Sequence, residues 1–433
     1  MRVLMFGWEF PPFISGGLGT ACFGLTKQLA KRNVKILFVL PKIKGASQVE
    51  AAGDITIIGG QNYLSNEIEE VKKKISFFEK EFTVNSPLRP YISYESYKDY
   101  LEKIKEFEKE SNGLHSSKGN FSIDFSGDYG QDLLSEVARF ALVGRYLAQR
   151  ESFDIIHAHD WMTFLAAIEA KKISGKPLVI HVHATEIDRC GENCNSEVFN
   201  LEKHGMENAD RIIAVSHRTK EIIIQYYQID PNKISVVHNG VDLDEIYQYD
   251  KTTRPFKNEK MVLYLGRITM QKGPDYFLEA AHLVVKRVQN VRFVMAGSGD
   301  MTRRLIERMA ALRIADRFHF TGFLGKTDRE RLFAMSDLYV MPSVSEPFGI
   351  TPLEAMRYNI PVIISKQSGV AELLSNVIKV DFWDVNKLAS AIINVLERPQ
   401  IASSLSEHNN EILQKMNWGV AADKVIDVYN SYR

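Results

Sequence analysis

The sequence predicts an α/β protein of two doubly wound domains, each with a parallel sheet covered by helices. Short runs of β-branched residues alternate with longer segments of helical period, which is typical of βαβ units. A chain of 433 residues accommodates two or three domains. The polar stretch Tyr247–Lys260, which contains Pro255, divides the alternating series in two and indicates a linker.

The first domain, placed at residues 1–245, begins with a strand at Arg2–Phe6 and an amphipathic helix at Leu18–Arg32. Its later strands show the same apolar, β-branched pattern, with helices between them. They are expected at Val34–Leu40, Asp154–His159, Leu178–His183, Arg211–Val215 and Ile234–His238. Between about residues 65 and 126 the pattern breaks into segments of mixed charge, which predicts an inserted helical segment with solvated faces rather than a membrane-docking or partner helix.

The second domain, placed at residues 246–410, repeats the alternation. Its strands are expected at Met261–Leu265, Val291–Ala296, Arg317–Phe320, Leu338–Met341 and Pro361–Ser365. The last segment, Trp418–Tyr432, has apolar residues at helical spacing and predicts a closing helix.

The amino-acid composition argues against several classes of function. The chain has 54 Lys and Arg residues and 54 Asp and Glu residues, and this balance argues against a protein that binds nucleic acid through bulk charge. The longest uncharged stretch, Phe10–Thr26, is too short and too rich in proline and glycine to span a bilayer, so we expect no membrane association. Three cysteines are too few and of odd number for a disulfide framework, and the segment after Met1 has no signal-peptide pattern; both favour a cytoplasmic protein.

Ligands of parallel sheets gather at the carboxyl ends of the strands, so the loops there are the places to search. Gly16, Gly17 and Leu18 precede the first helix, where glycines let the backbone approach an anion and the helix start offers free N–H groups. This pattern fits a phosphate cradle, and it equally fits a turn that only packs a helix on a sheet.

Histidines follow two neighbouring strands of the first domain. His157, His159 and Asp160 come from one strand, and His181 and His183 come from the next. We interpret them as residues lining a ligand site; a cluster of hydrogen-bonded supporting histidines and a zinc site are the alternatives. Strand alternation sends His157 and His159 to one face, and we expect it to leave no compact three-ligand set, so we predict no metal.

Two cations stand at one sheet edge of the second domain. Arg267 ends a strand, and Lys272 lies five residues later beside the start of a helix. Such a pair could neutralise a diphosphate as its leaving charge grows. Ordinary surface charge is the alternative.

Glu346 and Glu354 flank a strand-to-helix turn with seven residues between them. A capping box, with Thr351 as N-cap, Pro352 at N1 and Glu354 at N3, accounts for part of this run. It does not account for Glu346. Nor does it account for the backbone amides of Phe348, Gly349 and Ile350, which would face an anion held by the two cations.

Two weaker patterns remain. Asp242-Leu243-Asp244 has the D-x-D form of metal-diphosphate sites, although helix capping is the better interpretation. Cys190 and Cys194 are expected to be two unpaired thiols, because a metal site would need a second cysteine pair.

Taken in order, these residues resemble the motifs of the retaining nucleotide-sugar glycosyltransferases of the GT-B fold, families 4 and 5, which include glycogen and starch synthases. The resemblance covers nearly the whole chain. The matching motifs are Gly16-Gly17-Leu18, His157-Ala158-His159-Asp160-Trp161, His183, Asn239-Gly240-Val241-Asp242, Gly266-Arg267, Lys272-Gly273 and Glu346 with Glu354.

The resemblance implies two Rossmann-like domains that face each other across a cleft, with residues 411–433 forming a helix that crosses back to the first domain. It implies that Arg267 and Lys272 neutralise the donor diphosphate and that Glu346 contacts the transferred sugar. His183 and Asp160 would line the sugar and acceptor side. The nucleotide-sugar contacts implied besides these are Gly16, Gly17, Leu18, Asn239, Phe348, Gly349, Ile350, Thr351 and, on the ribose, Glu354.

The implied activity is retaining transfer of a hexose, glucose above all, from ADP-glucose or UDP-glucose to a sugar or α-glucan, without an obligatory metal. One departure bears on the donor: glycogen and starch synthases carry Lys-x-Gly-Gly, and this chain has Ile14-Ser15-Gly16-Gly17. A family 4 transferase with another glycan, lipid or small-molecule acceptor therefore stays open. So do a GT-B epimerase or phosphorylase and a non-catalytic carbohydrate-binding protein.

Overall fold

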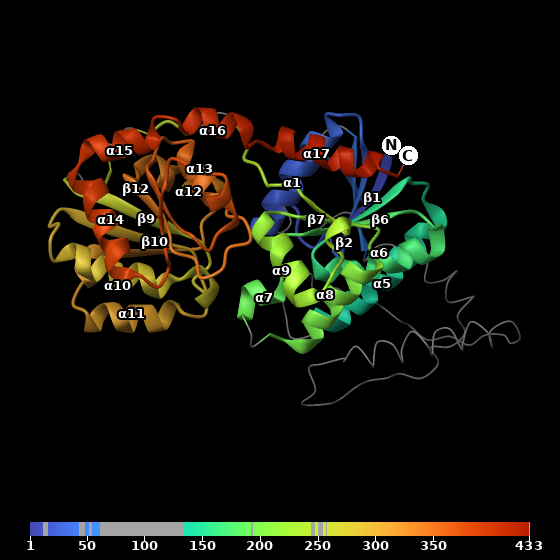
Figure 1. Ribbon diagram of the computed structural model, residues 1–433, viewed down its shortest axis with the longest axis horizontal. Helices are drawn as coiled ribbons and strands as arrows, with labels where there is room; N and C mark the ends of the chain where they lie inside the picture. Colours follow the sequence, from blue (N-terminus) through green and yellow to red (C-terminus); the bar gives the residue numbers. More distant parts are fainter. Residues whose placement is uncertain are drawn as a thin grey trace, which may run out of the picture.

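The computed structural model describes residues 1–11, 16–42, 48–51, 54–60, 133–191, 194–243, 247–249, 254–256 and 258–432. The insert expected at residues 65–126, together with Ile14, Ser15 and Asp244, lies outside the described residues. The described strands form two sheets with helices around each (Figure 1), so the prediction of an α/β fold with two doubly wound sheets is confirmed.

The first sheet has the order β3-β4-β2-β1-β5-β6-β7-β8 among the described strands. All neighbours are parallel except β3, which runs antiparallel to β4. The sequence did not predict β3 or β4, although the β-branched run at Ile55 fits a strand. The strands are β1 (Arg2–Phe6), β2 (Lys35–Leu40), β3 (Gln48–Ala51), β4 (Ile55–Gly59), β5 (Ile155–His159), β6 (Leu178–Val182), β7 (Arg211–Ala214) and β8 (Ile234–Val236).

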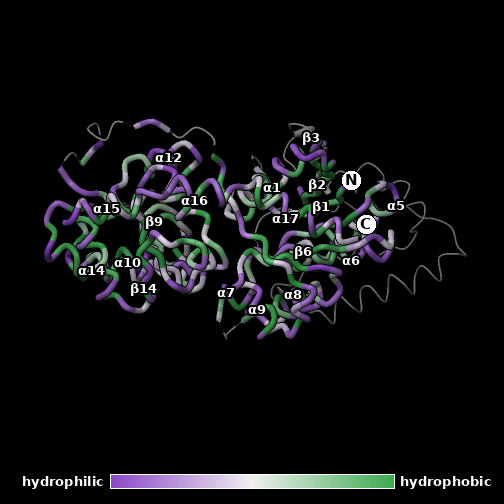
Figure 2. Tube along the Cα trace, turned by 45° about the horizontal axis from the view of Figure 1, so that its top comes forward, coloured by the Kyte–Doolittle hydropathy of each residue, from purple (hydrophilic) through white to green (hydrophobic). Residues whose placement is uncertain are grey.

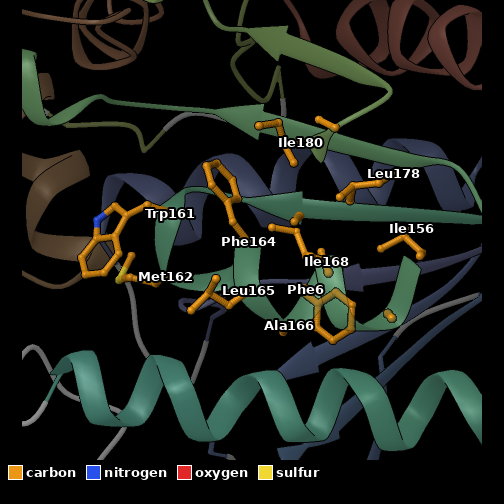
Figure 3. Close-up of a cluster of buried hydrophobic side chains, with 14 of the residues drawn as sticks. Phe6, Ile156, Trp161, Met162, Phe164, Leu165, Ala166, Ile168, Leu178 and Ile180 are labelled. Carbon is orange, nitrogen blue, oxygen red and sulfur yellow. The ribbon is translucent and has the colours of Figure 1, made fainter. Parts of the chain in front are cut away.

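Helices cover both faces of this sheet. On one face the core includes Phe6, Ile156, Phe164 and Ile180, which Figure 3 shows among the strands and the adjoining helix. Two helices of this face touch closely at Gly144, where a Cβ would lie 2.1 Å from the carbonyl oxygen of Ala166. The helices of this domain are α1 (Gly17–Ala30), α5 (Leu133–Arg150), α6 (Trp161–Ser174), α7 (Glu186–Cys190), α8 (Ser196–Asn208) and α9 (His217–Tyr227).

The second sheet is parallel, with the order β11-β10-β9-β12-β13-β14 among the described strands. Figure 2 shows hydrophobic colouring along central strands such as β9, as expected for a sheet buried on both faces. The three-residue strand β14 was not predicted. The strands are β9 (Lys260–Leu265), β10 (Val291–Ala296), β11 (Phe318–Gly322), β12 (Leu338–Met341), β13 (Val362–Ser365) and β14 (Ile378–Val380).

The helices of the second half separate its strands and then lead back toward the first domain. The short turn η4 (Met270–Lys272) precedes α10 and carries the predicted Lys272. The helices are α10 (Pro274–Val285), α11 (Thr302–Ala311), α12 (Lys326–Met335), α13 (Thr351–Met356), α14 (Val385–Glu397), α15 (Pro399–Ser406) and α16 (Asn409–Lys415).

The last helix, α17 (Trp418–Asn430), packs on α1 rather than on the second sheet, and Figure 1 shows the two side by side. Trp418, Val425 and Tyr429 belong to the same core cluster as Leu25 of α1. Gly24 makes room for the indole, because a Cβ there would lie 2.3 Å from Nε1 of Trp418. None of the described helices is long and apolar enough to cross a membrane.

Candidate functional site

The loop after β12 meets the turn η4 through an ion pair. Lys272 Nζ donates to Oε2 of Glu346 at 2.7 Å, and the hydroxyl of Ser343 donates to the same oxygen at 3.2 Å. Glu346 is only 8% exposed, so two donors hold its carboxylate in nearly buried surroundings. The structure therefore brings together two predicted site residues that lie 74 positions apart in the chain.

Backbone contacts fix the position of this pair. The carbonyl of Gln271 accepts hydrogen bonds from the amides of Val344 at 2.9 Å and Ser345 at 3.4 Å. Gly273 has a φ of +65°, and a Cβ there would lie 2.0 Å from the carbonyl oxygen of Pro342. Only glycine fits both the backbone conformation and this close approach. The Lys272–Glu346 contact therefore requires glycine at position 273.

Arg267, the second predicted cation, lies on the turn after β9 with an exposed side chain. The hydroxyl of Tyr264 donates to the Arg267 carbonyl at 2.8 Å and holds the turn. Burial raises the pKa of Tyr264 well above its usual value, so this hydroxyl stays a donor. Among the described residues no acidic side chain pairs with the guanidinium of Arg267, which leaves it available to an anionic ligand.

The helix after Glu346 differs from the prediction. Helix α13 begins at Thr351, its N-cap is Ile350, and no side chain caps it. The predicted capping box is therefore wrong: Glu354 lies 3.4 Å from the guanidinium of Arg329 instead of returning to the helix start. Arg329 lies on another helix and is an ion-pair partner that no local sequence pattern could reveal.

The residues between the two glutamates pack tightly. Phe348 is 2% exposed, and its ring lies 6.0 Å from that of His238. Gly349 has a φ of +100°, and a Cβ there would lie 3.2 Å from Cγ of Glu346. This turn therefore shapes the surroundings of Glu346, whatever its amides bind.

The glycine turn at the start of α1 has a different partner from the one expected. Oε2 of Glu9 accepts from the amides of Gly16 and Gly19, each at 3.0 Å. A Cβ at Gly16 would lie 2.5 Å from this carboxylate oxygen, so the close backbone approach at Gly16 serves Glu9. At Gly17 nothing lies within 4 Å of the position of a Cβ, so the structure leaves space there for a ligand. Leu18 packs partly buried against the core.

Asp160 adopts a strained backbone, with φ 59° and ψ 167°, at the junction of β5 and α6. Its carboxylate does not cap its own helix. Instead Oδ1 accepts from the amides of His183 at 2.7 Å and Ala184 at 3.4 Å. Burial raises the pKa of Asp160 to about 6, although Arg189 and these amides favour its ionised form. Asp160 and His183, expected to line one side of the site, are thus directly linked.

Four histidines form one column of rings: His157 and His159 of β5, His181 of β6, and His183 directly after β6. His159 pairs with His181 in the parallel register, so alternate residues of both strands face the same side. One ring nitrogen each of His157, His159 and His181 lies within 4.8 Å of the others, and Cys22, His159 and His183 form a second such group. The expectation that alternation would leave no compact three-ligand set is therefore wrong. Burial lowers the pKa of His183 to about 3.

Several hydrogen bonds join the two domains beside Glu346. Ser216 Oγ donates to the carbonyl of Pro347 at 2.6 Å. Ser345 accepts from Arg218 at 3.1 Å and donates to Asp188 at 2.7 Å. Sequence reasoning missed Ser216, Arg218 and Ser345 as contacts, because no local pattern tells which loops of two domains meet.

Asn239 lies at the connection between the domains. It is 7% exposed and lines a hollow of about 280 Å³ together with Lys415, Asn417 and Lys424. Asp242 is an ion-pair partner of Lys27 at 3.7 Å. Asn239 therefore sits near the ends of α16 and α17, in a hollow whose lining does not include Lys272 or Glu346.

The three cysteines are free thiols: Cys22 is buried, and Cys190 and Cys194 are partly buried. The chemistry of the assembled site lies instead in its charges. A carboxylate in nearly buried surroundings, a paired lysine and an exposed arginine stand around the strand ends of the second sheet. Such an arrangement suits an anionic ligand with a polar, uncharged portion close to Glu346.

Comparison with known proteins shows which family the chain belongs to. Residues 247–411 match the family model described as Glycosyl transferases group 1, and residues 129–245 match Glycosyltransferase Family 4. The uncharacterized glycosyltransferase MJ1607 of Methanocaldococcus jannaschii is 30% identical over 296 residues, covering 64% of this chain and 75% of that protein. The glycogen synthase of Mycobacterium tuberculosis is 24% identical and covers 99% of this chain and 94% of its own length.

Solved structures share the fold. The sucrose-phosphate synthase of Thermosynechococcus elongatus superposes with a TM-score of 0.73 at 18% identity, covering 100% of this chain and 98% of its own. Anabaena HepE, solved in complex with UDP-glucose, gives a TM-score of 0.66 at 17% identity, with 100% of both chains covered.

Proposed function

This chain belongs to the GT-B glycosyltransferases of the family 4 and 5 kind, and from that membership we propose that it is a retaining hexosyltransferase. The proposed reaction moves a hexose, glucose in the first instance, from a nucleoside diphosphate sugar to a sugar or α-glucan acceptor in the cytoplasm. The observation that carries the proposal is the contact of Lys272 with the nearly buried Glu346, with Arg267 exposed on the turn preceding η4.

In this proposal the two cations bind the diphosphate. Arg267 has no acidic partner among the described residues, and Lys272 can turn one of its three ammonium protons to a phosphate oxygen while it keeps Glu346. Both charges stabilise the negative charge that grows on the leaving phosphate. Because these side chains supply the positive charge, we propose that transfer needs no metal at the diphosphate, and added Mg²⁺ or Mn²⁺ should leave turnover unchanged.

Glu346 would hold the hexose. Its Oε2 is occupied by Lys272 and Ser343, and among the described residues no donor reaches its Oε1. A sugar hydroxyl can donate to that oxygen. Glu354, Phe348, Gly349, Ile350, Thr351 and Asn239 would surround the nucleotide side of the donor, Gly17 and Leu18 would approach its phosphates, and Asp160 with His183 would face the acceptor side.

The deciding experiment incubates the full chain with ADP-glucose, UDP-glucose and GDP-mannose and measures nucleotide release. Each donor is paired with glycogen, a maltooligosaccharide, simple hexoses and a polyprenyl-phosphate sugar. Release with one donor, together with an α-linked product by NMR, supports the proposal. A β-linked product overturns the proposed retaining mechanism. The absence of nucleotide release with every pair of donor and acceptor overturns the proposed transferase activity.

The non-catalytic alternative is tested in the same experiment. A carbohydrate-binding protein of this fold would bind a glucan on an affinity gel and release no nucleotide. The acceptor panel also separates an α-glucan synthase from a transferase that uses a lipid or a small molecule.

A further inference from the structure

The buried histidines of β5 and β6 form a group of ligating side chains that the proposed transfer does not use as a whole. His157, His159 and His181 are each at most 2% exposed. Their rings stack in sequence: centroids are 4.5 Å apart for His157 and His159 and 5.3 Å apart for His159 and His181. They face the side of the sheet that α1 and α17 cover, since Tyr429 of α17 reaches His157.

Most nitrogens of this group have no protein partner. Among the described residues no hydrogen bond is made by Nε2 of His157, Nε2 of His159 or either ring nitrogen of His181. A buried polar atom without a partner costs about 1–3 kcal/mol, and such atoms are rare in native structures. Each of the three neighbouring rings therefore has at least one such nitrogen, which points to a shared ligand that accepts lone pairs.

The other nitrogens of two rings are held in the way that metal-bound histidines require. Nδ1 of His157 lies 2.5 Å from the hydroxyl of Tyr429, and Nδ1 of His159 lies 2.9 Å from Nε2 of His183. Metal-bound histidines nearly always bond their second ring nitrogen to a carboxylate, a backbone carbonyl or water, which fixes the ring and its tautomer; here a tyrosine hydroxyl and a histidine nitrogen take that place. Nε2 of His157 and Nε2 of His159 are then the nitrogens left to bind an ion.

The spacing fits one ion. One nitrogen of each ring lies within 4.8 Å of the other two. Zinc–nitrogen bonds of about 2.0–2.1 Å in a tetrahedron separate the nitrogens by roughly 3.3 Å, so no pair has to approach by more than about 1.5 Å. The buried carboxylates Glu9 and Asp160 stand at the ends of β1 and β5 and offset part of a positive charge.

We propose that His157, His159 and His181 bind one divalent transition-metal ion. Zinc is the expected ion, because imidazole nitrogen is one of its common ligands. The ion joins β5 and β6 and, through Tyr429, the closing helix α17. It is separate from the donor diphosphate, so the inference goes beyond the proposed transfer and does not depend on it. The column of rings is closest to solvent at His183, which is half-buried.

The experiment measures metal binding and needs no activity. The full chain is stripped with a chelator, returned to buffer and titrated with Zn²⁺, and bound zinc is counted by mass spectrometry after gel filtration. We expect one zinc per chain and a higher thermal midpoint with zinc than without it. No retained zinc, or zinc that leaves the midpoint unchanged, overturns the proposal.

Variants locate the ion. His181→Leu and His157→Leu should each weaken zinc binding at least about 100-fold, while His319→Leu, which removes an exposed histidine, should not. Glu372→Gln controls for the surface group His217, His238 and Glu372 and should retain the zinc. Unchanged binding in His181→Leu, or loss of zinc only in Glu372→Gln, contradicts the assignment.

Two further measurements protect the test. If the leucine variants do not fold, Tyr429→Phe removes only the outer hydroxyl and should weaken binding about 10–100-fold; binding equal to that of the unmodified chain counts against the site. Cobalt in place of zinc reports the ligands: a thiolate charge-transfer band that disappears in Cys22→Ser would put Cys22 in the ligand set and overturn the three-histidine assignment.

Discussion

At the scale of single residues, the contact between Lys272 and Glu346 makes each side chain the condition for the other's position. Removal of Lys272 leaves a nearly buried carboxylate whose one remaining donor among the described residues is Ser343, and removal of the Glu346 charge frees the ammonium to move. Effects on turnover should therefore exceed those expected for an exposed ion pair.

We predict that Lys272→Ala and Glu346→Gln each lower kcat about 10²–10³-fold, the loss typical of one electrostatic contact to a developing charge. Steady-state rates of nucleotide release with the best donor provide the measurement. Arg303→Ala and Glu307→Ala break an exposed ion pair on α11 and should leave kcat unchanged. Near-normal kcat in both site variants would show that these residues do not take part in the mechanism.

A second residue-scale prediction concerns Gly273. Gly273→Ala adds strain at φ +65° and a Cβ 2.0 Å from the Pro342 carbonyl oxygen, so it should destabilise the second domain and lower kcat. Gly175→Ala is the matched control, because its φ is +66° and nothing lies within 4 Å of the added carbon. The alanine at 273 should cost about 1–3 kcal/mol more than the alanine at 175 in denaturant unfolding. Equal costs would show that the loop adapts.

At the scale of helices and strands, the strand-to-loop order was predictable and the contacts between loops were not. The positions of β1, β5, β6, β9 and β10 follow from runs of β-branched residues, and the site residues follow those strands. The strand β14 has only three residues, too few for a periodic pattern. The capping box at Thr351 and the expectation of no compact three-ligand set failed for one reason: Arg329 and the β5–β6 register lie outside any local sequence window.

The buried carboxylate of Glu202 on α8 should make the stability of the fold depend on pH. Glu202 is 1% exposed, accepts from the hydroxyl of Tyr227 and from the Glu186 amide, and pairs with Arg189. Burial raises the pKa of Glu202 from its ordinary 4.5 to about 7. Between these values the folded chain retains a proton that the unfolded chain has lost, so this group makes folding less favourable as pH rises.

We therefore predict that Glu202→Gln becomes more stable relative to the unmodified chain as pH rises from 5 to 8, by up to about 3 kcal/mol. Glutamine keeps an oxygen for Tyr227 and cannot ionise. Thermal midpoints of both chains across this range measure the difference, and Glu207→Gln, an exposed change on the same helix, is the control. A difference that is constant with pH would rule out the shifted carboxylate.

At the scale of the whole molecule, the two domains meet at the loop that carries Glu346. Ser345 bonds to both Arg218 and Asp188 of the first domain, so it reports whether domain contact matters for turnover. Two hydrogen bonds of about 0.5–1.5 kcal/mol each predict a loss of about tenfold in kcat/KM for Ser345→Ala, with little change in thermal midpoint. Ser406→Ala is the control, because this hydroxyl donates to the Ala402 carbonyl of its own helix. An unchanged kcat/KM would mean that this contact does not form during the reaction.

The packing of α17 on α1 also determines when the first domain can be completed during synthesis on the ribosome. Arg32 and its partner Asp423 lie 391 residues apart, so the helix that covers Leu25 is translated long after α1. Throughout that interval an apolar face of the nascent first domain stays bare, and such surfaces bind chaperones or other chains. A message truncated before the codon for Trp418 would yield a protein with both sheets and an uncovered face, a product that cellular quality control should remove.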